Sequence, residues 1–388
     1  MNNVKPKTEE RNDINKYREK KLRRKKKIRF AVFALVVLVI ILIIANWRTV
    51  FAPFKDIGIK RGGGGFPVTL PGSTQYYLGE MGENFYLLTD TYLYTYTSDG
   101  AEIAGIQHKF QNPASVSNSR RVMVYDRNGK SFRVYSRTGE VFSNTVDDII
   151  VFGQIGNDER SAVITTSTRY SNYLCVFNGE GRQIFRWASP DEKIMGVCFG
   201  QGDKSVYASV IGEQNGELRG SIVKFDISGS GSEVWRTAIG ERVTYSLELC
   251  SDGIYAVTGS GALLLNENTG EISALNSFTR PINALPRTDR IRAVIFRDSA
   301  TNKETAVTYD NALQQIGSIT PDDDITACDI SDGRLYLLIG SRLYAYDQSL
   351  NETWSCELGE EYSNVKIING YAYLLGYNTV QRVQLQGR

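Results

Sequence analysis

The sequence contains a single histidine, His108, and this scarcity excludes several kinds of enzyme. A triad hydrolase relies on a histidine that titrates near neutral pH, and catalytic zinc sites commonly use two or three histidines. His108 lies in residues 105–110, a connection between two strands rather than a catalytic motif. We therefore expect a hydrogen-bonded or solvent-facing structural role for this residue.

Cysteine is sparse as well, and none of the five cysteines belongs to a CxxC pair. An odd number of unpaired cysteines argues against a disulfide framework and against a structural zinc site. Three of them recur at the same place in successive apolar strands, so we expect small, buried core thiols. The five are Cys175, Cys198, Cys250, Cys328 and Cys356.

The body of the chain also lacks an excess of basic residues. Residues 1–29 hold 13 Lys or Arg against 4 Asp or Glu, whereas the remainder holds 32 basic and 39 acidic residues. A body of this charge offers no basic patch that would neutralise phosphates, which argues against nucleic-acid binding. A basic tail joined to a mildly acidic body is typical of a membrane protein.

One segment has no charged or strongly polar residue at all. Residues 30–45 are apolar, and residues 28–47 would form a helix of about 30 Å, roughly one hydrocarbon thickness. The Lys- and Arg-rich stretch before it favours a cytoplasmic N-terminus. The sequence thus predicts a basic cytoplasmic tail (1–29), a transmembrane helix (30–47) and an extracytoplasmic remainder in the plasma membrane.

A cleaved signal peptide is the alternative to this anchor, but the sequence lacks a good cleavage site. The small-residue candidate at residues 50–52 is followed directly by Pro53. Residues 48–65 read as a stalk and glycine linker. The glycines at 62–65 are not followed by Lys-Ser or Lys-Thr, so they do not form a phosphate loop.

From residue 66 to 388 a four-strand pattern repeats, and no stretch shows helical periodicity. Turns that precede the fourth strand, such as 138–139, 180–181 and 269–270, recur about every 39 to 48 residues. We therefore predict an all-β, eight-bladed β-propeller, with seven blades as the alternative. Within one hairpin, Asn128-Gly129 predicts a two-residue type I′ turn.

The last repeat ends without its fourth strand, and an orphan strand at residues 66–70 precedes the first repeat. A ring of blades must join its two ends or leave a sheet edge open. We expect residues 66–70 to supply the missing outer strand, where Pro67 is tolerated because it lies at an edge.

The repeats resemble those of the quinoprotein (PQQ-like) propeller superfamily. Trp187, Trp235 and Trp354 fall on fourth strands, and residues 268–271 read Asn-Thr-Gly-Glu; no tryptophan is followed by Asp, so the WD40 signature is absent. The whole layout is similar to a family of membrane-anchored propellers from Gram-positive bacteria that has no assigned activity. Quinoprotein dehydrogenases need a calcium and often an adjacent cysteine pair. This chain has no such pair, so the resemblance implies a non-catalytic relative without a cofactor.

Two groups of carboxylates are the remaining candidates for a site. Both stand just before the first strands of blades, where loops of a propeller face the channel, and could bind a cation or act as acid and base. The alternative is that they are solvated turn residues. The groups are Asp147 and Asp148, and Asp322, Asp323 and Asp324.

These observations favour a non-enzymatic binding or scaffolding module in the cell envelope, with a protein or glycan partner. A large rigid ring with loop-rich faces suits that role. The alternative is an envelope enzyme, or a cofactor-binding quinoprotein-like protein that uses the carboxylates around the channel. The identity of the partner does not follow from the sequence.

Overall fold

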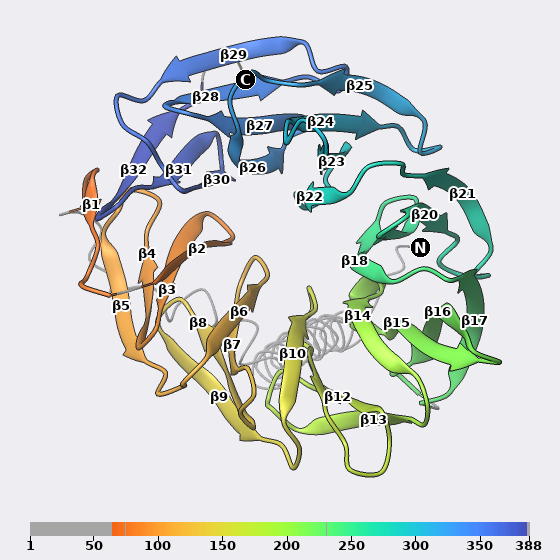
Figure 1. Cartoon of the computed structure of the whole chain (residues 1–388). Coiled ribbons are helices and arrows are strands. Elements are labelled where there is room, and N and C mark those ends of the chain that lie inside the picture. The colour runs from red at the N-terminus through yellow and green to blue at the C-terminus, as the bar shows by residue number, and fades with distance from the viewer. Residues whose placement is uncertain (1–63, 74, 230, 386–388) are drawn as a thin grey trace, which may run out of the picture. The chain divides into compact units, whose positions relative to one another are not determined.

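The computed structural model describes residues 64–385 except 74 and 230, and these residues form a closed ring of eight four-stranded antiparallel sheets (Figure 1). The predictions of an all-β fold and of eight blades are confirmed. Within the described part of the chain, no helix has the length and apolar character needed to cross a membrane. The predicted transmembrane helix at residues 30–47 lies outside the described residues.

Each blade takes four strands, numbered here from the first strand, at the channel, to the fourth, at the perimeter. Blades 1 to 4 consist of β2 (Tyr76–Met81), β3 (Asn84–Thr89), β4 (Tyr92–Tyr96) and β5 (Glu102–Gln107); β6 (Pro113–Ser117), β7 (Val122–Asp126), β8 (Ser131–Ser136) and β9 (Gly139–Thr145); β10 (Ile150–Ile155), β11 (Ser161–Thr165), β12 (Asn172–Phe177) and β13 (Gln183–Ser189); and β14 (Lys193–Phe199), β15 (Ser205–Gln214), β16 (Glu217–Asp226) and β17 (Glu233–Gly240). A short 3-10 helix, η2 (Gln201–Asp203), precedes β15.

Blades 5 to 8 complete the ring. They consist of β18 (Thr244–Cys250), β19 (Gly253–Thr258), β20 (Gly261–Leu265) and β21 (Ile272–Ser277); β22 (Ile282–Ala284), β23 (Arg292–Arg297), β24 (Glu304–Tyr309) and β25 (Gln315–Ile319); β26 (Ile325–Ser331), β27 (Arg334–Ile339), β28 (Arg342–Tyr346) and β29 (Glu352–Glu357); and β30 (Asn364–Ile368), β31 (Tyr371–Leu375), β32 (Thr379–Gln384) and β1 (Val68–Thr69).

The sequence pattern of a strand follows from its place in the blade. Second strands such as β11 and β19 are buried at every position, because neighbouring blades cover both faces of the sheet. They therefore read as continuous apolar runs. Fourth strands such as β9 and β21 alternate between exposed and half-buried positions, since only one face meets a neighbour. The core thus lies between the blades, around the middle strands.

The two ends of the chain close the ring in one sheet. Strand β1 is the outermost strand of blade 8 and pairs with β32, with Val68 opposite Val380 and Thr69 opposite Thr379. The backbone N–H of Leu70 continues the ladder and donates to the carbonyl of Asn378 at 2.8 Å. The predicted strand exchange is confirmed, and so is the position of the three predicted tryptophans on fourth strands β13, β17 and β29.

The type I′ turn predicted at Asn128-Gly129 is wrong. Four residues, 127–130, separate β7 from β8, and of the two only Asn128 has a positive φ (65°). The next blade explains the wider turn. The N–H of Asn128 donates to the carbonyl of Ile150 at 3.1 Å, and the N–H of Ile150 donates to the carbonyl of Gly129 at 2.8 Å.

Candidate functional site

The channel is lined by the first strands, and five successive blades carry the same irregularity there. In blades 3 to 7 the ladder between the first and second strands has a register shift near the start of the first strand, so one residue faces no partner. Such β-bulges re-aim a side chain and often border functional sites. The unpaired residues, here called the bulge ring, are Val151, Met195, Tyr245, Asn283 and Thr326.

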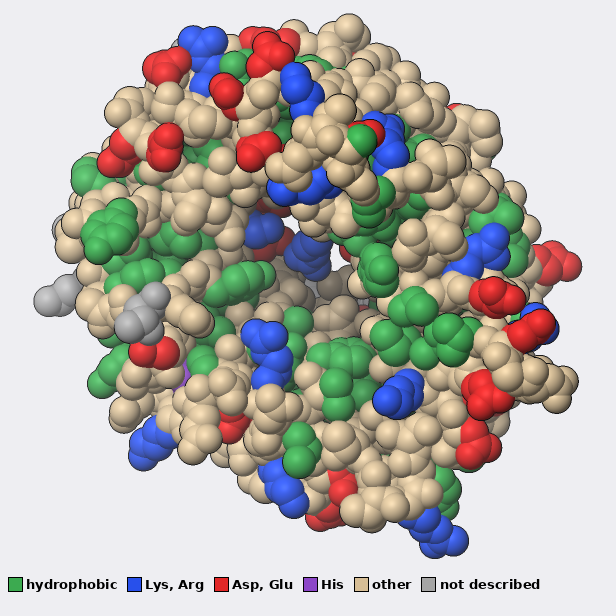
Figure 2. Space-filling model, in the orientation of Figure 1, with side chains coloured by type: hydrophobic (Ala, Val, Ile, Leu, Met, Phe, Trp, Pro, Cys, Tyr) green, Lys and Arg blue, Asp and Glu red, His purple; other side chains and the backbone are tan. Residues whose placement is uncertain are grey.

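The bulge ring has an apolar half. Val151 is 42% exposed, Met195 37% and Tyr245 60%, and Ile149 beside them is 41% exposed. Hydrophobic side chains gather around the central opening over β10, β14 and β18 (Figure 2). Isolated exposed apolar residues are normal on a protein surface, but a contiguous group marks an interaction site.

The other half of the bulge ring is polar and borders an acidic connection. Asn283 and Thr326 take the places held by apolar residues in blades 3 to 5. Residues 322–324, all aspartate and all exposed, lead directly into β26, which carries Thr326. In Figure 2 acidic side chains lie over the outer part of blades 7 and 8, together with several basic side chains. One side of the channel mouth, here called the apolar side, thus exposes mainly apolar residues, with Asp147 exposed beside them. The other, here called the acidic side, exposes Asp322, Asp323 and Asp324.

A long connection crosses the opposite end of the channel. Seven residues, 285–291, join β22 to β23, whereas two residues make this connection in blades 1, 5, 7 and 8. From it, Arg287 reaches Glu80 on β2, with 2.9 Å between Nη1 and Oε1. Thr288 donates from its backbone N–H (3.0 Å) and its hydroxyl (2.6 Å) to Glu248 on β18. Residues 285–291 thus connect blade 6 with blades 1 and 5 through side-chain contacts.

A largely buried ion pair lies between the first strands of blades 7 and 8. Lys366 lies 3.3 Å from Asp329, measured between Nζ and Oδ1, and both side chains are largely buried. Burial alone would lower the pKa of Lys366, but the nearby carboxylates, chiefly Asp329, outweigh it and raise the pKa. This ion pair joins the first strands of blades 7 and 8.

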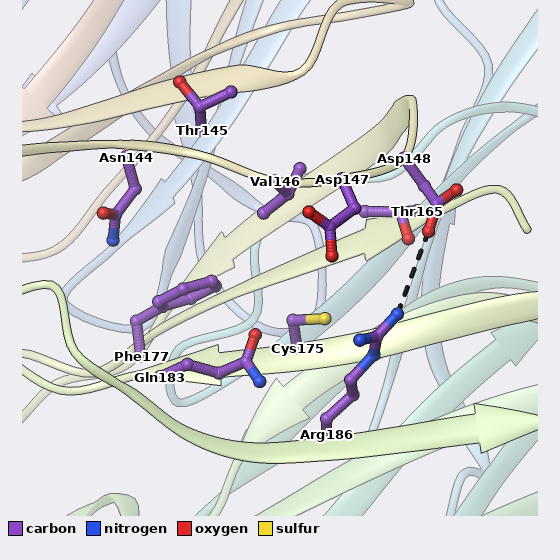
Figure 3. Close-up of a pocket in the computed structure, with 10 residues that line it drawn as sticks. All are labelled: Asn144, Thr145, Val146, Asp147, Asp148, Thr165, Cys175, Phe177, Gln183 and Arg186. Carbon is purple, nitrogen blue, oxygen red and sulfur yellow. Dashed lines mark ion pairs between the residues drawn. The ribbon is translucent and has the colours of Figure 1, made fainter.

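The predicted carboxylates Asp147 and Asp148 lie in the connection from β9 to β10 and line a small pocket between blades 2 and 3 (Figure 3). Asp148 Oδ2 is 3.9 Å from Nη2 of Arg186, which lies on the outer strand β13. The guanidinium of Arg186 also stacks over the ring of Tyr173 at 3.8 Å. The structure therefore brings these two carboxylates to the outer strand of blade 3.

The pocket of Figure 3 is small and has no reactive thiol. Its volume is about 100 Å³, room for roughly three water molecules. Cys175 lines it, but burial raises the pKa of this thiol to about 11, so it stays protonated at neutral pH. Its full lining is Asn144, Thr145, Val146, Asp147, Asp148, Thr165, Cys175, Phe177, Gln183 and Arg186.

The predicted carboxylates Asp322, Asp323 and Asp324 lie in the connection from β25 to β26 and point into solvent. Asp322 pairs with Lys303 at 3.7 Å, but its side chain is fully exposed, so the pair is weak. Among the described residues no group of three or more His, Cys, Asp or Glu side chains could hold a metal ion.

His108 is buried in the connection between blades 1 and 2, with both ring nitrogens in hydrogen bonds. Nε2 lies 3.1 Å from the carbonyl of Thr89, and the N–H of Phe110 donates to Nδ1 at 3.1 Å. Because Nδ1 accepts a hydrogen bond, the ring is neutral with its proton on Nε2. Burial lowers its pKa accordingly. The expectation of a hydrogen-bonded structural histidine is confirmed.

Sequence reasoning missed the bulge ring, because the spacing that marks it lies in the burial of the strands rather than in their residue types. In a regular strand, buried residues recur every second position. In β10, β14 and β18 the buried residues on either side of the bulge are three apart, for example Ile194 and Val197 around Met195. Two of these buried residues are Gly153 and Thr244, so the sequence alone does not show the skipped position in β10 and β18.

The fold and the channel define this chain as an eight-bladed β-propeller with a side-chain-lined mouth. It belongs to the family of unknown function DUF5711, whose model matches residues 70–385. No curated protein matches the chain.

Three solved structures share the fold and are distant in sequence. BamB from Moraxella catarrhalis is 12% identical, with a TM-score of 0.57 over 82% of this chain and 99% of BamB. Sqt1 from Saccharomyces cerevisiae is 12% identical, with a TM-score of 0.57 over 82% of this chain and all of Sqt1. The C-terminal WD40 domain of Sif2 is 12% identical, with a TM-score of 0.59 over 83% of this chain and all of that domain. At this identity the similarity shows the fold alone.

Proposed function

We propose that this chain is a membrane-anchored, extracytoplasmic scaffold that binds a protein partner at the bulge ring. The observation that carries the proposal is the repeated bulge, which exposes Val151, Met195 and Tyr245 side by side at the channel mouth. A bulge breaks a ladder at some cost in hydrogen bonding, so its repetition in five blades favours a role in recognition. Exposed aromatic and Met side chains are typical anchors in protein interfaces.

The proposal is of binding rather than catalysis because the histidine and four of the five cysteines are held by burial in forms that are poor nucleophiles. The single histidine is fixed as a neutral donor and acceptor between backbone groups. Burial also raises the pKa of Cys328 to about 12, which leaves it a protonated core thiol.

The anchor and its orientation belong to the same proposal and are supported by the sequence. The apolar segment 30–45 follows a stretch with nine more basic than acidic residues. In the described part, β1 begins next to the turn at residues 97–101, because Gly64 and Gly65 pack against Asp99 and Gly100. That turn lies at the end of the ring opposite to the bulge ring, so a tether would leave the channel mouth accessible.

Site-specific photo-crosslinking tests the binding role in the full-length chain in its native membranes. A photoreactive amino acid at position 195 should give one discrete protein adduct. The matched control is position 234 on β17, where Val234 is 51% exposed at the perimeter and should give none. Equal adducts at both positions, or no adduct at position 195, would overturn the proposed binding site.

Protease protection tests the orientation separately. Protease added outside intact, wall-free cells should remove the propeller and leave the N-terminal tail protected. A propeller that is cleaved only after the membrane is permeabilised would refute the extracytoplasmic assignment.

A further inference from the structure

We infer that the partner segment bound at the channel mouth is amphipathic, with apolar side chains on one face and lysine or arginine on the other. This inference rests on the proposed function and specifies the chemistry of its partner. It follows from the two unlike sides of the mouth: exposed apolar residues on blades 3 to 5 and exposed carboxylates on the connections of blades 6 to 8.

The apolar side offers anchoring positions of graded size. Tyr245 is the most exposed of the group, and its hydroxyl end lies over Gly259 in the turn between β19 and β20, where a side chain would clash. Met195 and Val151 continue the surface on the next two first strands. An aromatic ring, a flexible thioether and a branched aliphatic group can accommodate a row of apolar side chains.

The acidic side consists of two connections that lead into first strands, each with at least two exposed carboxylates and no basic residue. Residues 320–324 carry Asp322, Asp323 and Asp324, and residues 358–363 carry Glu360 and Glu361; all five are exposed. Among the described residues, Asp322 is the one of these five carboxylates in an ion pair, with Lys303. Glu360 accepts a hydrogen bond from the Tyr362 hydroxyl at 2.8 Å. Exposed carboxylates beside an apolar surface attract a basic partner and fix its orientation.

The same charges disfavour two other occupants. An anionic membrane surface would be repelled by these carboxylates, because such surfaces attract basic segments. A second copy of this chain docked mouth to mouth would place either its acidic connections or its apolar residues against these carboxylates, because a two-fold interface pairs residue i with j and j with i. Both would leave the apolar side covered but the acidic side uncompensated.

Carbodiimide crosslinking tests the inference directly, because the reagent joins a carboxylate to a lysine amine without a spacer. In native membranes, the full-length chain should form a carbodiimide adduct with the same protein that a photoreactive residue at position 195 captures. The triple variant D322N/D323N/D324N should lose this adduct by at least tenfold, and peptide mapping should place a lysine of the partner at residues 322–324. The matched control, D158N, alters an exposed aspartate at the opposite end of the ring and should leave the adduct unchanged.

The two crosslinks separate failure of the inference from failure of the proposed function. A photo-adduct at position 195 with a carbodiimide adduct that the triple variant does not reduce would overturn the basic partner and leave the binding role intact. No photo-adduct would overturn both. An adduct made only of a second copy of this chain, or only of lipid, would overturn the inference as well. Circular dichroism of each variant confirms that the fold is retained.

Discussion

Two sectors of the ring are built from the same repeat but differ in the ladder next to the channel. In blades 8, 1 and 2 the first and second strands pair without interruption, whereas in blades 3 to 7 every such ladder has a bulge. The first sector contains the joint between the two ends of the chain, and the second presents unpaired residues at the mouth. The first and second strands thus pair regularly in the sector where the two ends of the chain meet. They pair with a bulge in the sector where the unpaired side chains are exposed.

The closing sector is also distinguished by packed aromatic rings. Phe85 stacks on Tyr96 with 4.9 Å between ring centroids and lies 4.9 Å from Tyr373. Phe66, which precedes β1, meets Tyr373 edge-on at 5.8 Å. The Tyr373 hydroxyl donates to the carbonyl of Ser98 at 2.9 Å and so connects blade 8 with blade 1. These contacts hold blade 8 against blade 1, where the two ends of the propeller chain meet.

The largest effect on this comparison is expected from Phe85→Ala. Phe85 is fully buried at the centre of the aromatic cluster, so truncation removes apolar contacts and leaves a cavity. We expect the free energy of unfolding to fall by about 3–5 kcal/mol. Chemical denaturation measures it, with Phe85→Leu as a control that should cost less than half as much. A loss below 1 kcal/mol would show that the cluster does not hold the ring closed.

A disulfide across the joint should have the opposite effect. Thr69 and Thr379 face each other between β1 and β32, next to the hydrogen-bonded pair of Leu70 and Asn378. Non-hydrogen-bonded pairs have Cα atoms about 4.5 Å apart, within the range for a disulfide. The variant T69C/T379C should oxidise and gain about 2–4 kcal/mol in stability. Mass spectrometry of the oxidised variant, with each single cysteine as control, checks the bond; its absence would contradict the strand exchange.

A smaller, pH-dependent effect is expected at His108, in the connection that leaves blade 1. Its folded-state pKa is lowered by burial, whereas in the unfolded chain the ring titrates near its ordinary value of about 6.5. The unfolded state therefore takes up the proton first, and stability is constant above this value and falls as the pH drops below it. Thermal unfolding between pH 7.5 and 5 measures the loss. His108→Gln should show a weaker pH dependence, and an unchanged slope would assign the effect to other groups.

The fold could be predicted because its determinants are local in sequence. Alternation in strands such as β4, recurrent turn residues such as Gly181 and Gly270, and an orphan strand at residues 66–70 suffice for the ring and its closure. The bulge ring is different, because a bulge is a relation between two strands and depends on the register of the partner. Arg186, the ion-pair partner of Asp148, is 38 residues away on another strand, so the sequence of one segment does not predict this contact either.

The smallest effect on stability, and the sharpest contrast with Phe85, is expected from Tyr245→Ser. Tyr245 is an aromatic residue of a first strand that is 60% exposed, so its removal leaves no cavity, and the free energy of unfolding should change by no more than about 0.5 kcal/mol. The binding affinity, in contrast, should fall clearly, because exposed aromatic anchors at the centre of an interface often contribute more than 1 kcal/mol each. The yield of the photo-adduct from position 195 should therefore fall at least fivefold, while Ile272→Ser on the outer strand β21, 41% exposed, should change neither quantity. If Tyr245→Ser instead destabilises the protein as much as Phe85→Ala does, the bulged blades hold the ring together as the closing sector does, and the division between the two sectors fails.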